Sequence, residues 1–128
     1  APRSANGRPA ARTARHGDTI DGVTIPFDEE QRMAKAYWVS WYHKISDPAK
    51  MAAYAKLAGP AIEAGGGRFV ARAPAAQAYE GASKERTTVI EFPSVEQAIA
   101  THDSPAYQAA LAVLDGGAAR HIRILPGV

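Results

Sequence analysis

The chain has 128 residues, of which 46% are hydrophobic and 22% are charged, and its formal net charge is +2. A chain of this length fits one domain with its own core, and the scattered basic residues do not form the cluster typical of a nucleic-acid-binding surface. The absence of cysteine excludes disulfides and thiolate chemistry. No apolar run approaches the roughly 20 residues of a membrane span, so we expect a cytoplasmic protein with neither nucleic acid nor membrane as a partner.

The first part of the chain, residues 1–32, combines charged residues, prolines and glycines with little hydrophobic periodicity. We therefore divide the chain into an N-terminal extension, residues 1–32, and a compact domain, residues 33–128. Residues 1–15 have the composition of a targeting leader, although a flexible arm is the favoured interpretation. Ile20 to Phe27 contains the turn signal Asp21-Gly22 and predicts a short strand or hairpin. We expect this segment to dock on a sheet edge of the domain or on a partner subunit.

The domain begins with a strand, because Ala36 to His43 is rich in aromatic and β-branched residues. Apolar side chains fall on both faces of this strand: Trp38 and Tyr42 on one, and Tyr37, Val39 and Trp41 on the other. We therefore expect both faces to be covered.

A helix is predicted next, because Asp47-Pro48 supplies a capping side chain and a proline for the first turn. One apolar stripe follows at helical spacing: Met51, Tyr54, Ala55, Ala58 and Ile62. Gly59-Pro60 is expected to kink this helix, because proline lacks a backbone donor. Gly65–Gly67 ends the helix. The glycines precede a strand, so they are interpreted as a helix stop and not as a phosphate-binding loop.

Two strands follow the glycines. Arg68 to Arg72 predicts the first, and Gln77 to Glu80 is expected to continue it at a sheet edge beyond the break at Pro74. Thr87 to Phe92 predicts the second strand, which places one set of side chains on a common face: Thr88, Ile90 and Phe92.

The last part of the chain predicts a second helical region and a final strand. Ser94 and Gln97 form the pattern of a capping box at the start of the helix. Asp103-Ser104-Pro105 restarts the helix with the serine as its cap. His121 to Leu125 is the last predicted strand.

The predicted order is strand, helix, strand, strand, helix, strand. This order is typical of the ferredoxin-like α+β fold, in which both helices cover one face of a four-stranded antiparallel sheet. The other face would leave roughly 300 Å² of sheet uncovered, as estimated from strand spacing and rise. A second copy packed sheet to sheet is the simplest cover, so we expect a homodimer.

The domain resembles a family of small bacterial proteins known as domain of unknown function 1330, or DUF1330. The resemblance depends on these segments: Tyr37-Trp38-Val39, Asp47-Pro48, Tyr54, Gly66-Gly67-Arg68-Phe69, Arg72, Glu80-Gly81, Ile90-Glu91-Phe92-Pro93-Ser94 and Ser104-Pro105 with Tyr107-Gln108. It implies the dimeric α+β barrel fold and a candidate cleft, but no substrate. Family members often carry an aromatic residue where this chain has Thr101, so a pocket lined by that position would be wider or more polar here.

Candidate catalytic residues are few. His102 with Asp103 is a candidate general base, because a histidine beside a carboxylate exchanges protons near neutral pH. His43 is a further candidate. The alternative is that Asp103 or Ser104 caps a helix and that His102 is solvated.

The candidate ligand-binding residues are Trp41, Arg72, Glu80, Glu91, Ser104 and Tyr107. Arg72 can hold a carboxylate with two hydrogen bonds, or it can form a salt bridge with Glu80 that fixes the hairpin. Glu91, inside a strand, indicates a hydrated cavity or a cross-strand ion pair. Ser104 is better explained as a helix cap.

Two functional hypotheses remain open. In the first, a homodimer binds or converts a small carboxylate or aromatic molecule in a cleft between sheet and helices, without a cofactor. Its polar groups would be His43, Arg72, Glu91, His102 and Tyr107. In the second, the dimer is structural or sequesters a ligand without turnover. No metal site is predicted, because the four histidines lack ligand spacing.

Overall fold

The computed structural model describes residues 17–20, 23–26 and 34–128. β1 (Gly17–Ile20) and β2 (Val23–Pro26) form a two-stranded antiparallel sheet, which confirms a hairpin in the extension. The residues of its turn lie outside the described part of the chain, as do residues 1–15. Among the described strands, β1 and β2 pair only with each other. The expected pairing with a sheet edge of the same chain is therefore wrong for these strands, and docking on a partner stays a prediction.

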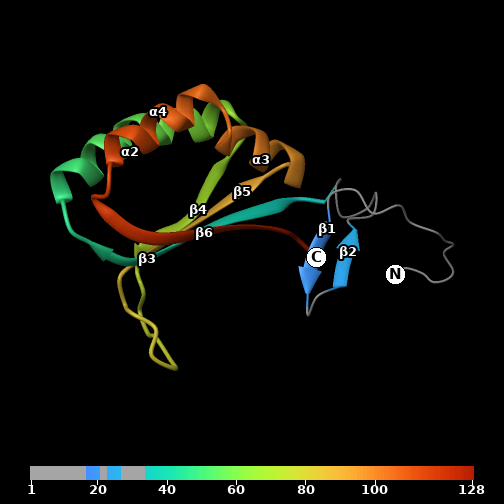
Figure 1. The fold of residues 1–128 in the computed structure, drawn as a ribbon, viewed down its shortest axis with the longest axis horizontal. Helices are drawn as coiled ribbons and strands as arrows, with labels where there is room; N and C mark the ends of the chain where they lie inside the picture. The colour runs from blue at the N-terminus through green and yellow to red at the C-terminus, as the bar shows by residue number, and fades with distance from the viewer. Residues whose placement is uncertain (1–16, 21–22, 27–33) are drawn as a thin grey trace, which may run out of the picture.

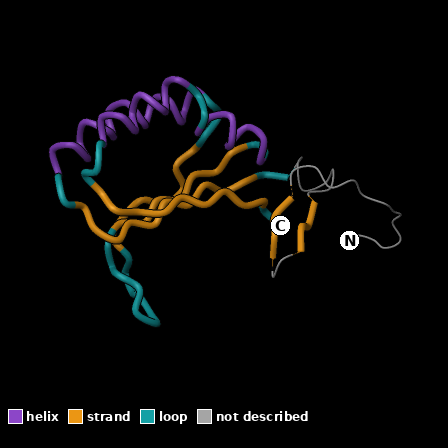
Figure 2. Tube along the Cα trace, in the orientation of Figure 1, coloured by secondary structure: helices purple, strands orange, loops and turns teal. Residues whose placement is uncertain are grey.

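The domain contains these elements in chain order: β3 (Ala36–Ile45), α2 (Pro48–Ala64), β4 (Arg68–Pro74), β5 (Arg86–Phe92), α3 (Val95–His102), α4 (Pro105–Leu114) and β6 (Ala118–Pro126). The four strands form an antiparallel sheet in the order β4-β5-β3-β6. The three described helices lie over one face of this sheet, and no described helix lies over its other face (Figures 1 and 2). The predicted ferredoxin-like fold is confirmed. The sheet is open, with β4 and β6 at its edges.

The helix boundaries follow from capping, as the sequence predicts. The Asp47 carboxylate accepts hydrogen bonds from the first backbone N–H groups of α2, and the helix ends at a glycine pair in which Gly66 has φ +96°. Ser104 accepts a hydrogen bond from Tyr107 N at 3.2 Å and separates α3 from α4. α2 continues through Pro60 to Ala64. No described helix is long and apolar enough to cross a bilayer.

Only half of the expected capping box at α3 forms. Ser94 Oγ accepts a hydrogen bond from Gln97 N at 3.1 Å, as expected. The Gln97 side chain does not return to the cap but donates to Gly65 O at 2.9 Å. Because Gly65 closes α2, this bond ties the end of α2 to the start of α3.

The core lies between the helices and the sheet, and alternation along the strands decides which side chains enter it. On β3, Trp38 and Tyr42 face the helices and are at most 2% exposed. Trp38 stacks on Phe92 with ring centroids 5.9 Å apart and meets the edge of Tyr107 at 4.9 Å. Such aromatic pairs add to the stability gained from burial alone.

One predicted strand is absent. Gln77 to Glu80 does not continue β4, and residues 75–85 form a loop that projects from the sheet on the side away from the helices (Figure 1). Pro74 ends β4 because it has no backbone donor for a further ladder bond. A bond from Ala75 N to Lys84 O, at 3.0 Å, holds the base of the loop together.

Candidate functional site

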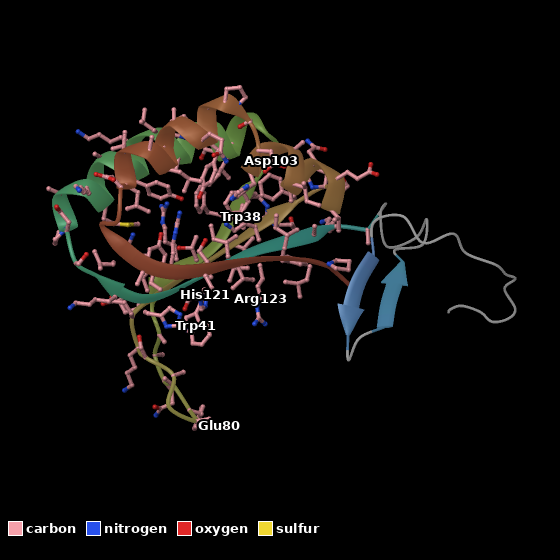
Figure 3. The ribbon with its side chains drawn as sticks, viewed as in Figure 1. Trp38, Trp41, Glu80, Asp103, His121 and Arg123 are labelled. Atoms are coloured by element: carbon pink, nitrogen blue, oxygen red, sulfur yellow. The ribbon has the colours of Figure 1, made fainter. Side chains whose placement is uncertain are left out.

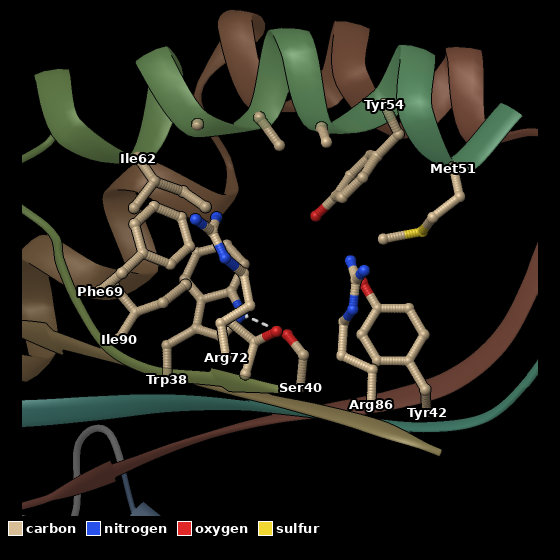
Figure 4. A pocket seen from close by; sticks show the side chains of 14 residues that line it. Trp38, Ser40, Tyr42, Met51, Tyr54, Ile62, Phe69, Arg72, Arg86 and Ile90 are labelled. Carbon is tan, nitrogen blue, oxygen red and sulfur yellow. Dashed lines mark hydrogen bonds between the residues drawn. The ribbon is translucent and has the colours of Figure 1, made fainter. Parts of the chain in front are cut away.

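A cavity lies between α2 and the strands β3, β5 and β4 (Figure 4). Its volume is about 40 Å³, which is room for about three water molecules or one small functional group, and it is partly open to solvent. Apolar side chains form most of the wall: Trp38, Met51, Ile62, Phe69 and Ile90. The wall can therefore contact an apolar body, while its polar groups select what enters.

Two arginines reach into this cavity from the sheet. Arg72 is on β4 and Arg86 is the first residue of β5; both lie on the helix side, as their register with Thr88 requires. Figure 4 shows both guanidinium groups rising toward α2. The Arg72 guanidinium also lies over the Phe69 ring, 4.5 Å from its centroid. Among the described residues, neither arginine has a carboxylate partner, so both charges remain available to a ligand.

A third arginine supports the wall of the cavity from β6. Arg120 Nη1 donates to Tyr42 Oη at 2.8 Å and to Tyr54 Oη at 3.1 Å. Its Nη2 donates to Tyr107 Oη at 3.1 Å. Tyr54 and Tyr107 share a further hydrogen bond of 2.6 Å between their hydroxyls. Tyr42 and Tyr54 line the cavity. The Arg120 charge therefore lies directly behind two phenols of the cavity wall.

Two phenols of this network, those of Tyr42 and Tyr107, are hydrogen-bond donors at neutral pH. Burial raises the pKa of Tyr42, and the nearby Arg120 charge offsets only part of that increase. Burial likewise raises the pKa of Tyr107, and its neighbour Tyr54 adds to the effect. Both hydroxyls therefore stay protonated. The described residues that line the cavity include no Asp, Glu or His, so this wall favours an acceptor or an anion.

Of the predicted ligand-binding residues, Arg72 lines the cavity. Tyr107 does not line it, but its hydroxyl bonds the hydroxyl of Tyr54, which does. Ser104 caps α4 and lies in a second, wide-open groove on the helix layer. That groove has a volume of about 410 Å³ and is lined mostly by small side chains. Thr101 also lines it, and its hydroxyl donates to Gln97 O at 2.8 Å.

The predicted pair His102 and Asp103 is in contact, with Nδ1 and Oδ1 3.0 Å apart. The His102 ring also packs on Trp38 and Tyr107, with centroids 5.6 and 5.3 Å away. It is therefore not simply solvated, as one interpretation of the sequence supposed. Neither residue lines the cavity.

Other predicted residues lie on the opposite face of the sheet. Trp41 is 37% exposed there, and His43 Nε2 lies 3.1 Å from His121 Nδ1. Figure 3 places Trp41 and His121 on the side of the sheet away from the helices. The expectation that His43 lines the cleft between sheet and helices is wrong, because its position on β3 alternates with those of Tyr42 and Trp38.

Glu91 also lies on this opposite face, in a cross-strand ion pair and not in a hydrated cavity. Its Oε1 accepts a hydrogen bond from Arg68 Nη2 at 2.8 Å, and its Oε2 accepts one from Tyr37 Oη at 3.1 Å. Lys35 Nζ lies 3.7 Å away. The Arg68 hydrogen bond holds the pKa of Glu91 below its ordinary value, against a smaller opposing effect of desolvation.

Glu80 lies at the tip of the loop between β4 and β5, far from the cavity (Figure 3). It adopts a left-handed conformation with φ 58°. No described contact joins it to Arg72, so of the two interpretations of Arg72 the salt bridge with Glu80 is not formed in the described structure. Its loop position follows from the early end of β4.

Four arginine and tyrosine residues of the site were not predicted as site residues from the sequence: Tyr42, Tyr54, Arg86 and Arg120. Tyr42 was assigned only to one face of the first strand, and Tyr54 was assigned to the apolar stripe of a helix and to the family resemblance. Arg86 and Arg120 lie just outside the predicted strands, because β5 begins at Arg86 and β6 begins at Ala118. The available signal was an arginine in phase with inward-facing residues, such as Arg120 with Ile122 and Ile124.

The fold and this cavity define a small ferredoxin-like α+β domain with a donor-rich pocket between one helix and the sheet. The chain belongs to the family described as domain of unknown function (DUF1330), which it matches over residues 35–128. The predicted membership is confirmed. A comparison with curated proteins gave no match.

Solved structures with the same fold include proteins of unknown and of named activity. A protein of unknown function from Rhodopseudomonas palustris is 17% identical, with a TM-score of 0.64 over 76% of this chain and 85% of that chain. A putative antibiotic biosynthesis monooxygenase from Caulobacter crescentus is 15% identical, with a TM-score of 0.51 over 76% and 92%. SnoaB, a cofactor-independent oxygenase from Streptomyces nogalater, is 10% identical, with a TM-score of 0.52 over 74% and 94%. At these identities the likeness shows the fold alone.

Proposed function

We propose that this protein binds a small organic anion, a carboxylate with an apolar or aromatic body, whose polar end enters the cavity between α2 and the sheet and whose remainder extends through the side of the cavity that is open to solvent. The observation that carries the proposal is the imbalance of charge and hydrogen bonding in the wall. Arg72 and Arg86 enter the cavity without a carboxylate partner among the described residues, and the apolar wall suits the rest of such a molecule. Arginine binds carboxylates with two parallel hydrogen bonds.

The proposal is for binding and does not include turnover. Two pairs that contain histidine, His102–Asp103 and His43–His121, lie outside the cavity lining. Neither pair therefore places a general base against a ligand in the cavity. Two structural neighbours are named as oxygenases, but a shared fold at such low identity does not transfer a reaction.

Differential scanning fluorimetry with a panel of carboxylates tests the proposal. The panel begins with acetate, pyruvate and benzoate, and methylamine serves as a cation control. A ligand at one hundred times its dissociation constant stabilises the fold by about 2.7 kcal/mol, which raises the melting temperature visibly. The proposal predicts that carboxylates raise it and that methylamine does not.

Matched variants locate the site. Arg72→Gln and Arg86→Gln each remove one charge from the cavity and should weaken carboxylate binding about tenfold, as expected for a charged hydrogen bond. Arg123→Gln removes the same charge from the opposite face of the sheet (Figure 3) and should leave binding unchanged. Equal weakening by all three variants would show a general charge effect and refute the proposed site.

We also propose that a second copy covers the open face of the sheet. Apolar residues lie there with no helix of the described residues over them: Tyr37, Val39, Trp41, Val89 and Leu125. Tyr37 pairs with Leu125 and Val39 with Val89 across the strands, so these side chains are adjacent. Contiguous apolar surface of this kind is rare on monomers unless it binds a partner.

Sedimentation at micromolar concentration tests the assembly. The wild-type protein should be a dimer, and Leu125→Asp should dissociate it. Leu57→Asp is the matched control, because Leu57 on the outer side of α2 is 44% exposed and Leu125 is 46% exposed. A monomeric wild type, or dissociation by Leu57→Asp alone, would contradict the proposed interface.

A further inference from the structure

The hydroxyl hydrogens of the buried tyrosine network outnumber the acceptors available to them. Arg120 only donates, and it donates to the oxygens of Tyr42, Tyr54 and Tyr107. Each phenol carries one hydrogen of its own. The described structure offers these three hydrogens a single contact, the 2.6 Å bond between Tyr54 and Tyr107. Two hydroxyl hydrogens are therefore left without an acceptor.

Burial decides where these two hydrogens point. Tyr107 is 0% exposed and does not line the cavity, so an unpaired hydroxyl there carries the full penalty of a buried donor. Tyr107 avoids the penalty by donating to Tyr54. The hydrogen of Tyr54 is then the free one, and Tyr54 lines the cavity although it is only 5% exposed. Tyr42, 2% exposed and also in the lining, holds the second free hydrogen.

We infer that Tyr54 and Tyr42 form a binding site for a ligand oxygen, distinct from the carboxylate-binding arginines Arg72 and Arg86. The inference rests on the proposed function, because both groups line the same cavity. It narrows the ligand to a carboxylate that carries a further oxygen-bearing group, either a carbonyl or a phenol. The sites are complementary: the arginines bind the charged end, and the phenols bind the oxygen function.

The order of the hydrogen bonds strengthens the Tyr54 donor. Arg120 donates to Tyr107, Tyr107 donates to Tyr54, and Tyr54 is free to donate into the cavity. Hydrogen bonds in such a chain polarise one another in a low-dielectric interior. Donors arranged in advance around one oxygen stabilise negative charge on it. Tyr107 acts through Tyr54 and is a positioning residue.

Paired ligands test the oxygen site by isothermal titration. Pyruvate and propionate differ at a carbonyl near the carboxylate, and 4-oxopentanoate and pentanoate differ at a carbonyl farther along the chain. For at least one pair, the wild-type protein should bind the oxo acid about tenfold more tightly than its partner, the ratio expected from one or two neutral hydrogen bonds. Tyr54→Phe should reduce this ratio toward one. Tyr37→Phe, which removes a hydroxyl from the open face, should leave the ratio unchanged.

Arg72→Gln separates the two sites. It should weaken both members of a pair alike and preserve their ratio, because it acts on the carboxylate. Tyr107→Phe should lower the ratio only in part, because Tyr54 keeps its hydroxyl. Tyr42→Phe provides a second variant should Tyr54→Phe fail to fold, as judged by circular dichroism. Equal affinities within both pairs for the wild type, or a ratio unaffected by both tyrosine variants, would overturn the inference.

A probe without a carboxylate distinguishes failure of the oxygen site from failure of the proposed function. Bound 4-nitrophenol should ionise at a lower pH than free 4-nitrophenol, seen in its visible absorbance, and Tyr54→Phe should remove the shift. If no carboxylate binds but this shift is present, the carboxylate proposal fails and the oxygen site stands. If 4-nitrophenol shows no shift and no oxo acid is preferred, the oxygen site is refuted whatever the carboxylates do.

Discussion

Trp38 and Trp41 lie on the same strand, yet Trp38 is 0% exposed and Trp41 is 37% exposed. Trp38 packs against Phe92 and Tyr107 in the core, whereas Trp41 lies beside His43 on the open face. The same contrast holds for the arginines of the sheet. On the open face, Arg68 has a carboxylate partner, Glu91.

On the helix face, the arginines have no such partner among the described residues. Arg120 is bound only by phenols, and Arg72 and Arg86 extend into a cavity. The open face therefore pairs one of its arginines, Arg68, with a carboxylate, and the helix face keeps an excess of donors. An excess of this kind is what an anionic ligand needs, so the two faces are suited to different partners.

The largest expected effect compares the two tryptophans. Trp38→Ala should lower the free energy of unfolding by about 3–5 kcal/mol, because it leaves a cavity in a closely packed core. Trp41→Ala should lower it by less than about 1 kcal/mol, as for an exposed position. Urea denaturation at nanomolar concentration, which disfavours any dimer, measures both. Similar losses for the two variants would contradict the assignment of the faces.

An intermediate effect compares two tyrosine hydroxyls. Tyr107→Phe removes a buried hydroxyl that bonds Tyr54 and Arg120, and it should cost about 1–2 kcal/mol of unfolding free energy. Tyr37→Phe removes a partly exposed hydroxyl that donates to Glu91, and it should leave the unfolding free energy almost unchanged. The same denaturation measurement applies. A larger loss for Tyr37→Phe would mean that the open face, and not the tyrosine network, holds the essential polar contacts.

The smallest effect is the pH dependence of the Glu91 ion pair. The Arg68 hydrogen bond lowers the pKa of Glu91 in the folded state. A carboxylate of this kind stabilises the fold above its unfolded pKa of about 4.3, and the stabilisation is lost as the pH falls through the folded pKa. The melting temperature of Glu91→Gln should therefore lie slightly below wild type at neutral pH and approach it in acid. A difference that stays constant down to strong acid would contradict this ion pair.

The sequence predicted the fold well because its local signals are strong. Alternation placed Trp38 and Tyr42 on one face, and the cap at Ser104 separated two helices. The site was harder to predict, because Arg86 and Arg120 stand near the ends of strands. β6 begins at Ala118 since that residue pairs with Ile45, a long-range contact. Local propensity does not report such a contact, so Arg120 fell outside the predicted strand.

The same limit explains the candidates that belong to the other face. Trp41, His43 and Glu91 were grouped with Arg72 by residue type, although alternation assigns them to the open face. Tyr107 was named correctly, but its role depends on Tyr54 and Arg120, which come from other elements. Only the packed structure brings these three together.

Chemical-shift mapping by NMR tests the central claim, that the helix face holds the ligand, most directly. Titration of the labelled protein with pyruvate and with benzoate should shift side-chain signals along the cavity wall, at Trp38, Met51, Tyr54 and Arg72. Side-chain signals of Trp41, His43 and His121 on the open face should not move. Shifts confined to the open face, with a silent cavity wall, would contradict the account.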